Sequence, residues 1–138
     1  MTEHSKIFLD TNPIIYLIEG NKDFYDKVEG FFIDNKGADY ITSTATIAEY
    51  FPHPIREGRQ DYITAFNTFI EKMDIEVSDI DRDIAYKAAE IRASYTHFKP
   101  MDALQLASAV VSGCDVFLTN DKQLKQFMGL QILLVSEL

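Results

Sequence analysis

The fold is decided by Ile7-Phe8-Leu9-Asp10-Thr11-Asn12 and by Val116-Phe117-Leu118-Thr119-Asn120-Asp121, two stretches of a chain of 138 residues. Each stretch runs through apolar residues into an aspartate accompanied by threonine and asparagine. Such a run is typical of a strand that is buried on both faces of a parallel sheet and ends in an acid. Because ligands bind outside the carboxyl ends of the strands in open α/β sheets, the two acids predict one site.

The rest of the chain alternates between strand and helix patterns. Strands are expected at residues 7–10, 39–42, 75–78, 116–119 and 131–135. Helices are expected at residues 13–18, 24–32, 43–50, 62–73, 84–95 and 100–113, mostly from apolar residues three or four positions apart. The alternation predicts one α/β domain over residues 1–138 with a mainly parallel central sheet.

Composition restricts the class of protein further. Hydrophobic residues make up 46% and charged residues 25% of the chain, which is typical of a soluble globular protein. No apolar run approaches the roughly 20 residues that a membrane span needs, and the first residues lack the pattern of a secretory signal. Cys114 is the only cysteine, which fits a reducing compartment. We therefore expect a cytoplasmic protein with no membrane partner.

The net charge of −9 bears on the partner. Nucleic-acid binding rests mostly on Lys and Arg contacts to phosphate, so an acidic chain weakens that prediction. It does not exclude it if several acids gather around a divalent cation. A protein that binds a basic peptide partner would also be acidic.

Asp10 and Asp121 both have structural explanations as well as a functional one. Asp10 precedes a helix opened by Pro13, and either Asp10 or Asn12 could cap that helix. If Asn12 is the cap, Asp10 is free to face a ligand. Asp121 could form a turn or cap the segment that follows it.

Two further acids are expected at the same edge of the sheet. Glu49 lies in the opening turns of a helix that directly follows a strand, and its spacing from Thr46 also fits a capping box. Asp102 lies in the first turn of a helix of small residues, where the helix dipole favours an aspartate. Each acid alone has a structural explanation, whereas four acids at strand ends and helix starts predict a metal site.

The chemistry of such a cluster indicates the metal. Carboxylates packed together repel one another, and a divalent cation relieves that repulsion. A site of oxygen ligands with no neighbouring His or Cys favours Mg²⁺ or Mn²⁺ over zinc. Mg²⁺ retains water ligands, so such a site can present a nucleophilic water to a phosphodiester. Thr11 and Thr119 are expected to orient water or ligand oxygens beside the acids.

The ordered set of motifs resembles the PIN-domain ribonucleases, and most of all the VapC-like toxins of toxin–antitoxin pairs. The motifs are Leu9-Asp10-Thr11-Asn12, the helical Glu49, Asp102-Ala103-Leu104 and Thr119-Asn120-Asp121, which span nearly the whole chain in order. The resemblance implies a Rossmann-like three-layer sandwich, Mg²⁺-dependent cleavage of single-stranded RNA, a homodimer and a cognate antitoxin. It also implies that the catalytic, metal-holding acids are Asp10, Glu49, Asp102 and Asp121.

The remaining expectations concern the surroundings of these acids. Thr119 is expected to support them, with Thr11 and Asn120 nearby, whereas Asp115 precedes its strand and is given no role. The candidate RNA contacts are the basic residues near the motifs, Arg56, Arg59, Lys99 and Lys122.

Other functions compete with the toxin interpretation. One is a stand-alone PIN-domain nuclease for RNA processing. An aspartate-nucleophile phosphatase also begins with a strand that ends in Asp, but it usually needs a second acid two residues later, where this chain has Asn12. A PIN-like module that binds RNA or protein without cleaving it would be expected to lack one of the four acids.

Overall fold

A parallel sheet of five strands forms the centre of the protein, for which a computed structural model describes residues 4–138. The strands are β1 (Lys6–Leu9), β2 (Asp39–Ser43), β3 (Glu76–Ser78), β4 (Val116–Thr119) and β5 (Gln131–Leu134). They lie in the order β3-β2-β1-β4-β5, and every neighbouring pair is parallel. β1 and β4 are therefore adjacent, although they come from opposite ends of the chain.

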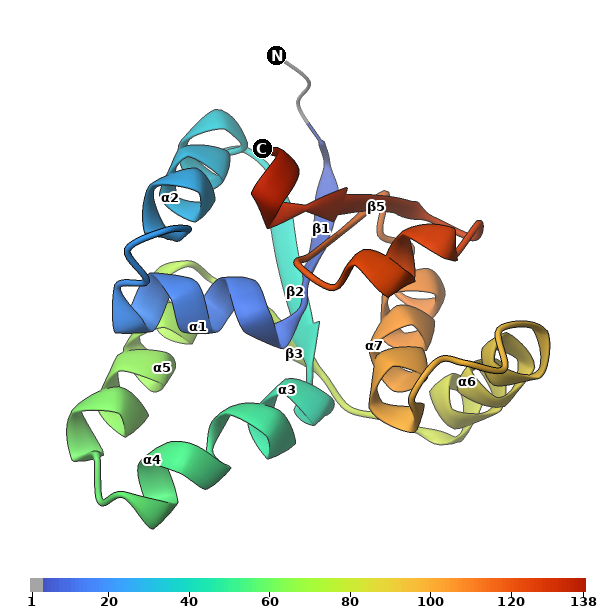
Figure 1. Ribbon diagram of the computed structural model, residues 1–138, viewed down its shortest axis with the longest axis horizontal. Helices are drawn as coiled ribbons and strands as arrows, with labels where there is room; N and C mark the ends of the chain where they lie inside the picture. Colours follow the sequence, from blue (N-terminus) through green and yellow to red (C-terminus); the bar gives the residue numbers. More distant parts are fainter. Residues whose placement is uncertain (1–3) are drawn as a thin grey trace.

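Helices cover both faces of the sheet, which produces the three layers visible in Figure 1. The helices are α1 (Thr11–Glu19), α2 (Tyr25–Asp34), α3 (Thr44–Tyr50), α4 (Pro52–Arg56), α5 (Gln60–Lys72), α6 (Arg82–Ser94) and α7 (Pro100–Val111). Two short 3-10 segments, η1 (Lys122–Gln126) and η2 (Val135–Glu137), follow β4 and β5. In Figure 1, α1, α2 and α5 lie on one side of the sheet, and α6 and α7 lie on the other.

Each face of the sheet has its own apolar core, because successive strand residues point to opposite faces. Ile7 and Leu9 of β1 pack in a cluster with residues of α1, α2 and α5. Phe8 packs in the other cluster, with residues of α6, α7 and η1, and its ring stacks on that of Phe117 with centroids 5.2 Å apart. Burial on both faces explains why the sequence shows continuous apolar runs here.

The strands and most helices predicted from the sequence are confirmed, each strand to within one residue at either end. The sequence does not predict α4, whose two prolines are typical of a loop; Pro52 is accommodated because the first helical position needs no N–H donor. The last long helix is predicted to close at Gly113. Its regular part ends at Val111, and Gly113 adopts the left-handed conformation of a helix-terminating glycine, with φ 74°, so the prediction is confirmed to within two residues. Within residues 4–138, no helix is long and apolar enough to cross a membrane.

The strand order places β1 where the chain reverses its direction of travel across the sheet. β2 and β3 lie on one side of β1, and β4 and β5 lie on the other. The connections that leave the carboxyl ends of β1 and β4 therefore diverge and open a crevice, the topological switch point of an α/β sheet. Asp10 directly follows β1 and Asp121 follows β4 by two residues, so both lie at this crevice.

Candidate active site

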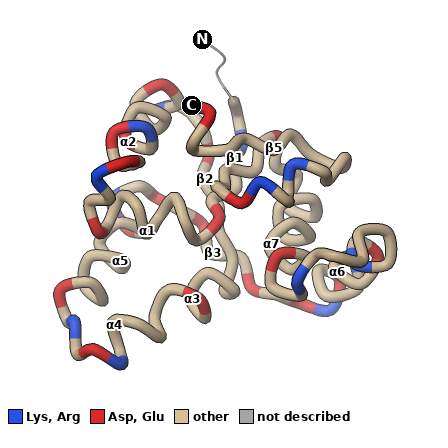
Figure 2. Tube along the Cα trace, viewed as in Figure 1, with Lys and Arg blue, Asp and Glu red and all other residues tan. Residues whose placement is uncertain are grey.

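Four acidic side chains line one cavity at the carboxyl ends of β1 and β4. The cavity has a volume of about 200 Å³ and is lined by Asp10, Thr11, Asn12, Ile15, Glu49, Asp102 and Asp121. The acids come from the residue before α1, from α3, from the first turn of α7 and from the residue before η1. Acidic segments on α3 and on the facing end of α7 are visible in Figure 2. The structure brings together all four acids that the sequence singles out.

Asp10 is the most deeply buried of these acids, with 8% of its surface exposed. Its Oδ1 accepts a hydrogen bond from the N–H of Thr11 at 2.9 Å, and its Oδ2 accepts one from the hydroxyl of Thr119 at 2.7 Å. Asp10 is the N-cap of α1, so the alternative in which Asn12 caps this helix is wrong. The helix begins at Thr11, which leaves Asn12 inside it. Capping does not remove Asp10 from the cavity.

The ionisation of Asp10 reflects this environment. Burial raises its pKa from 3.8 to about 6 because the charged form loses solvation. The nearby carboxylates of Glu49 and Asp102 raise the pKa further, while the hydrogen bonds from Thr119 and Thr11 lower it. An ionised Asp10 is therefore held in an environment that a cation would make more favourable.

Asp102 and Asp121 face the cavity from α7 and η1. Asp102 is half-buried, and burial, followed by the charges of Asp121 and Glu49, raises its pKa, whereas the ammonium of Lys99 lowers it. Asp121 caps η1, with Oδ1 accepting the backbone N–H of Gln123 at 3.0 Å. The capping role is therefore real, but the side chain of Asp121 still lines the cavity.

Both threonines expected beside the acids contact them. The hydroxyl of Thr11 donates to Oε1 of Glu49 at 2.6 Å. The hydroxyl of Thr119 donates to Asp10, and its oxygen accepts the backbone N–H of Asp121 at 3.1 Å. Each threonine therefore links two of the strand ends or helix starts that form the cavity.

Asn120 makes its hydrogen bonds away from the carboxylates. Its side-chain NH₂ donates to the hydroxyl of Tyr16 at 3.1 Å, and its Oδ1 accepts the N–H of Ser136 at 3.0 Å. The expectation that it supports the acids does not match these contacts. Asn120 joins α1 to the C-terminal segment instead.

A buried amide, Gln105, belongs to the surroundings of the site, and its place there is not predicted from the sequence. Its Nε2 donates to the hydroxyl oxygen of Thr46 at 2.7 Å and lies 3.4 Å from Oδ1 of Asp10. It follows Asp102 by three positions, the spacing that places two side chains on one face of a helix. A polar residue on that face of an otherwise apolar helix is the signal that could have identified it.

The basic residues expected to contact RNA differ in whether their side chains are already paired within the protein. Arg59 is already engaged: its Nε and Nη2 donate to the carboxylate of Asp61 at 3.0 and 2.8 Å, and its guanidinium lies 3.9 Å from the ring centroid of Tyr62. The other three candidates, Arg56, Lys99 and Lys122, are exposed. These three are the better candidates for contacts with phosphate.

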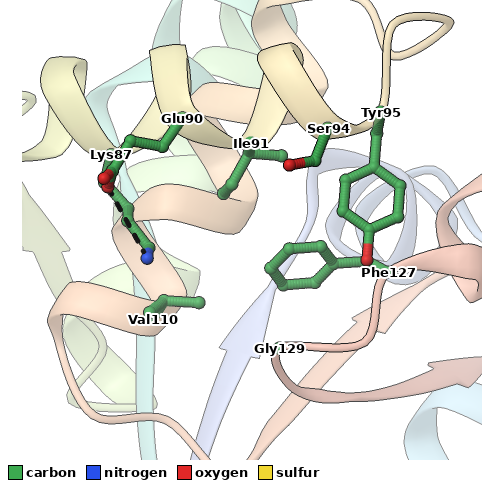
Figure 3. A pocket seen from close by; sticks show the side chains of 8 residues that line it. All are labelled: Lys87, Glu90, Ile91, Ser94, Tyr95, Val110, Phe127 and Gly129. Carbon is green, nitrogen blue, oxygen red and sulfur yellow. Dashed lines mark ion pairs between the residues drawn. The ribbon is translucent and has the colours of Figure 1, made fainter.

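A second cavity, of about 350 Å³, lies between α6, α7 and the connection to β5 (Figure 3). Its lining consists of Lys87, Glu90, Ile91, Ser94, Tyr95, Val110, Phe127 and Gly129. Its two charged side chains, Lys87 and Glu90, lie 3.7 Å apart and offset each other. The acidic cavity is therefore the stronger candidate for chemistry.

The donors around the acidic cavity fit a hard divalent cation in their chemistry. They are carboxylate and hydroxyl oxygens, the ligands that Mg²⁺ and Mn²⁺ prefer. Within residues 4–138, however, no three His, Cys, Asp or Glu side chains converge closely enough to hold a metal ion as they stand. Asp10 and Glu49 are each held by a threonine hydroxyl, and Asp121 by a backbone N–H. Each of these carboxylates keeps further lone pairs, so a cation would bind through water ligands or after a closer approach of these side chains.

The parallel sheet and the acidic cavity at its switch point define the class, an α/β domain with a candidate metal site. The family follows from comparison with known proteins. The model of the PIN domain matches residues 7–130, so the chain belongs to the PIN domain family. This range contains all four acids of the cavity. A search of curated proteins finds no match.

Solved structures share the fold over most of their length. A chain of DNA-bound VapBC from Salmonella typhimurium is 25% identical with a TM-score of 0.77, covering 95% of this chain and 98% of that one. VapBC2 from Rickettsia felis, bound to a promoter DNA fragment, is 17% identical with a TM-score of 0.76, covering 93% and 97%. VapC20 from Mycobacterium tuberculosis, a sarcin–ricin loop cleaving toxin, is 18% identical with a TM-score of 0.65, covering 80% and 86%. The expected three-layer fold is confirmed.

Proposed function

We propose that this protein is a metal-dependent endoribonuclease that cleaves single-stranded RNA and acts as the toxin of a toxin–antitoxin pair. The observation that supports the proposal most directly is the convergence of four acids on one cavity in a chain of the PIN domain family. A fold of this kind supports many functions, so the argument rests on the site.

The four acids would have different roles in binding the metal. Asp10, Asp102 and Asp121 would hold Mg²⁺ or Mn²⁺, with Glu49 binding directly or through water. When bound, the cation would supply an activated water and stabilise the charge that develops on the phosphodiester. The hydroxyls of Thr11 and Thr119 orient Glu49 and Asp10 through hydrogen bonds of 2.6 and 2.7 Å.

RNA would have to be attracted locally, because the whole chain has a net charge of −9. The exposed Lys99 begins the turn that contains Asp102, and the exposed Lys122 follows Asp121. Cations at these two positions can meet the phosphates on either side of the scissile bond. The VapC20 neighbour is named as a toxin that cleaves the sarcin–ricin loop, which supports RNA as the class of substrate.

The toxin role includes two protein partners, an antitoxin and a second copy of the chain. Several structural neighbours are toxin–antitoxin complexes, among them one from Klebsiella pneumoniae with 21% identity and a TM-score of 0.69. Apolar side chains available for protein contact lie beyond the acidic cavity on α3 and α4, where Ile47 is 39% and Ile55 is 66% exposed. The acidic surface suits a basic segment of an antitoxin.

Cleavage of labelled single-stranded RNA tests the catalytic part. We expect cleavage with Mg²⁺ or Mn²⁺, none after EDTA treatment, and recovery when metal is restored. A folded, metal-replete sample that binds RNA but cuts none of a panel of single-stranded and structured RNAs would support the silent binding module instead.

The partner is tested separately. We expect an open reading frame beside this gene to encode a small DNA-binding protein that forms a complex with this chain and stops cleavage. If no such protein exists but RNA is still cut, the stand-alone RNA-processing nuclease is correct. Light scattering on the purified chain tests the homodimer.

A further inference from the structure

Gln105 is the central member of a continuous chain of buried hydrogen bonds between α7 and the carboxyl ends of β1 and β2. Its side chain is 1% exposed. The hydroxyl of Ser43 donates to its Oε1 at 2.5 Å, and its Nε2 donates to Oγ1 of Thr46 at 2.7 Å. The Thr46 hydroxyl lies 2.7 Å from that of Thr42, which donates to the carbonyl of Leu9 at 2.8 Å. The chain of bonds therefore ends on the last residue of β1.

The two ends of this chain determine the direction of every hydrogen bond in it. The hydroxyl hydrogen of Thr42 is used on a carbonyl, so Thr46 must donate to Thr42, and the oxygen of Thr46 then accepts from the NH₂ of Gln105. Ser43 accepts the N–H of Ala45 at 3.1 Å, which leaves its hydroxyl hydrogen for Oε1 of Gln105. The amide is thereby held in one of its two orientations.

The same amide nitrogen faces the acidic site. Nε2 of Gln105 lies 3.4 Å from Oδ1 of Asp10 and 3.5 Å from the hydroxyl of Thr11, which in turn donates to Glu49. In the opposite orientation the amide oxygen would lie against the carboxylate of Asp10. The donor end of Gln105 therefore supports Asp10 and the partner of Glu49 together.

We propose that Gln105 is a positioning residue, which sets the separation of Asp10 and Glu49 by tying α3 to β1. Thr46 precedes Glu49 by three positions on α3, so the bond between Gln105 and Thr46 fixes the helix that presents Glu49. Gln105 does not line the cavity and acts only through its partners. The inference rests on the proposed nuclease function.

Packing alone does not require this polar chain. A buried polar network stabilises a fold only when all its members are satisfied, and apolar replacements of the same shape for both partners are nearly neutral. An apolar residue at position 105 with an apolar partner on α3 would fill the same space. An apolar residue could not donate a hydrogen bond to Thr46 or toward Asp10, because only a polar side chain offers a directional donor.

Two variants separate positioning from packing. Gln105→Met removes the acceptor of the Ser43 hydroxyl and the donor to Thr46. We therefore expect lower stability in urea and kcat for RNA cleavage lower by about 10- to 100-fold, with little change in KM. The double variant Gln105→Met, Thr46→Val removes both members of the Gln105–Thr46 pair but still leaves the Ser43 hydroxyl without its acceptor, so we expect part of the stability to return while kcat stays low. Gln131→Met, at the exposed amino end of β5, is the matched control and should match the wild type in both measurements.

A second measurement needs neither metal nor RNA. In the metal-free protein, the side-chain NH₂ of Gln105 should give a slowly exchanging amide signal, identified by sequence-specific NMR assignment of the wild type. We expect this signal to shift in Thr46→Val and in Asp10→Asn, and to keep its position in Gln131→Met.

The outcomes are distinguishable. If the wild type cleaves no RNA, the proposed function fails, while the amide signal still tests the contacts of Gln105. If the double variant is folded and cleaves as fast as the wild type, Gln105 is not a positioning residue and the nuclease function stands. If neither variant folds, the amide signal decides, and a signal that is unmoved in Asp10→Asn overturns the inference.

Discussion

At the carboxyl end of the sheet Asp10 is buried among other acids, whereas at the amino end Asp115 is exposed and bound by backbone N–H groups. Burial raises the pKa of Asp10 to about 6. Asp115 accepts hydrogen bonds from the N–H groups of Ser5 at 3.1 Å and Lys6 at 2.7 Å. Although loss of solvation acts in the opposite direction, these N–H groups hold the pKa of Asp115 below its ordinary value.

The opposite pKa shifts of Asp115 and Asp10 distinguish the amino edge of the sheet, which stabilises the protein, from the carboxyl edge, which is proposed to carry the catalytic site. Ionised Asp115 favours folding, since it ties the start of β1 to the residue before β4. Ionised Asp10 opposes folding in the metal-free protein, since it loses solvation next to like charges. A carboxylate kept in an unfavourable position at a sheet edge is typical of a functional site.

The largest effect is expected from Asp10→Asn, which keeps the size of the side chain and removes its charge. RNA cleavage should fall by more than about 100-fold, beyond what loss of a supporting residue costs. The free energy of unfolding at pH 7 should stay the same or rise, because a buried charge is removed. Cleavage assays and urea unfolding on the same sample measure both, and an active Asp10→Asn protein would contradict the assignment of the site.

The next effect is a pH dependence of stability in the metal-free protein. Because folded Asp10 keeps its proton up to about pH 6 and an unfolded Asp loses it near pH 4, folding binds protons in this window. The contribution of Asp10 to the free energy of unfolding should therefore fall by about 2–3 kcal/mol as pH rises from 4 to 6. Urea unfolding in EDTA checks this, with Asp10→Asn as the control in which the decrease should be smaller by the contribution of Asp10.

A smaller and opposite effect is expected at the amino end. Asp115→Ala removes the acceptor of two backbone N–H groups and should lower the free energy of unfolding by about 1 kcal/mol at pH 7, since the site is exposed. The loss should shrink as the pH falls below 3.8, the ordinary pKa of Asp, and should vanish only where folded Asp115, whose pKa is lower, is itself protonated. RNA cleavage should be unchanged. A loss of cleavage comparable to that of Asp10→Asn would show that the two edges of the sheet do not differ in function.

The smallest effect is expected at Cys114, which lies beside Asp115. Burial raises the pKa of its thiol to about 12, so at pH 8 almost none of it is the reactive thiolate. Iodoacetamide should leave the native protein unlabelled, active and equally stable, and should label it readily in urea. Rapid labelling of the native protein would show that the amino end of the sheet opens and exposes Cys114.

The sequence was sufficient for those residues whose local pattern and final contacts agree. The sequence predicts the position of Asp10 because a buried parallel strand appears as an apolar run, and the acid that ends the run must lie at the carboxyl edge. Asp115 precedes its strand, which predicts no role in the site, and it lies at the opposite edge of the sheet. Thr11 and Thr119 adjoin the strand ends, and both contact the acids as expected.

The sequence was insufficient where a partner comes from a distant segment. Asn120 adjoins Thr119, yet its contacts are with Tyr16 and Ser136. Arg59 is one of the few basic residues near the motifs, but its guanidinium already donates hydrogen bonds to the carboxylate of Asp61. Such pairings depend on side-chain directions that no spacing along the chain specifies.

The sequence by itself determined the alternation of strands and helices, the five strand positions and the four acids, because apolar periodicity and strand-end chemistry are local properties of the chain. Only the tertiary structure decided the strand order, which sets β1 beside β4 and so places Asp10 and Asp121 at one crevice. It also decided that Gln105 lies behind that crevice. Strand neighbours and buried polar partners are selected by the packing of the whole core, where every polar group must find a partner from a distant part of the chain.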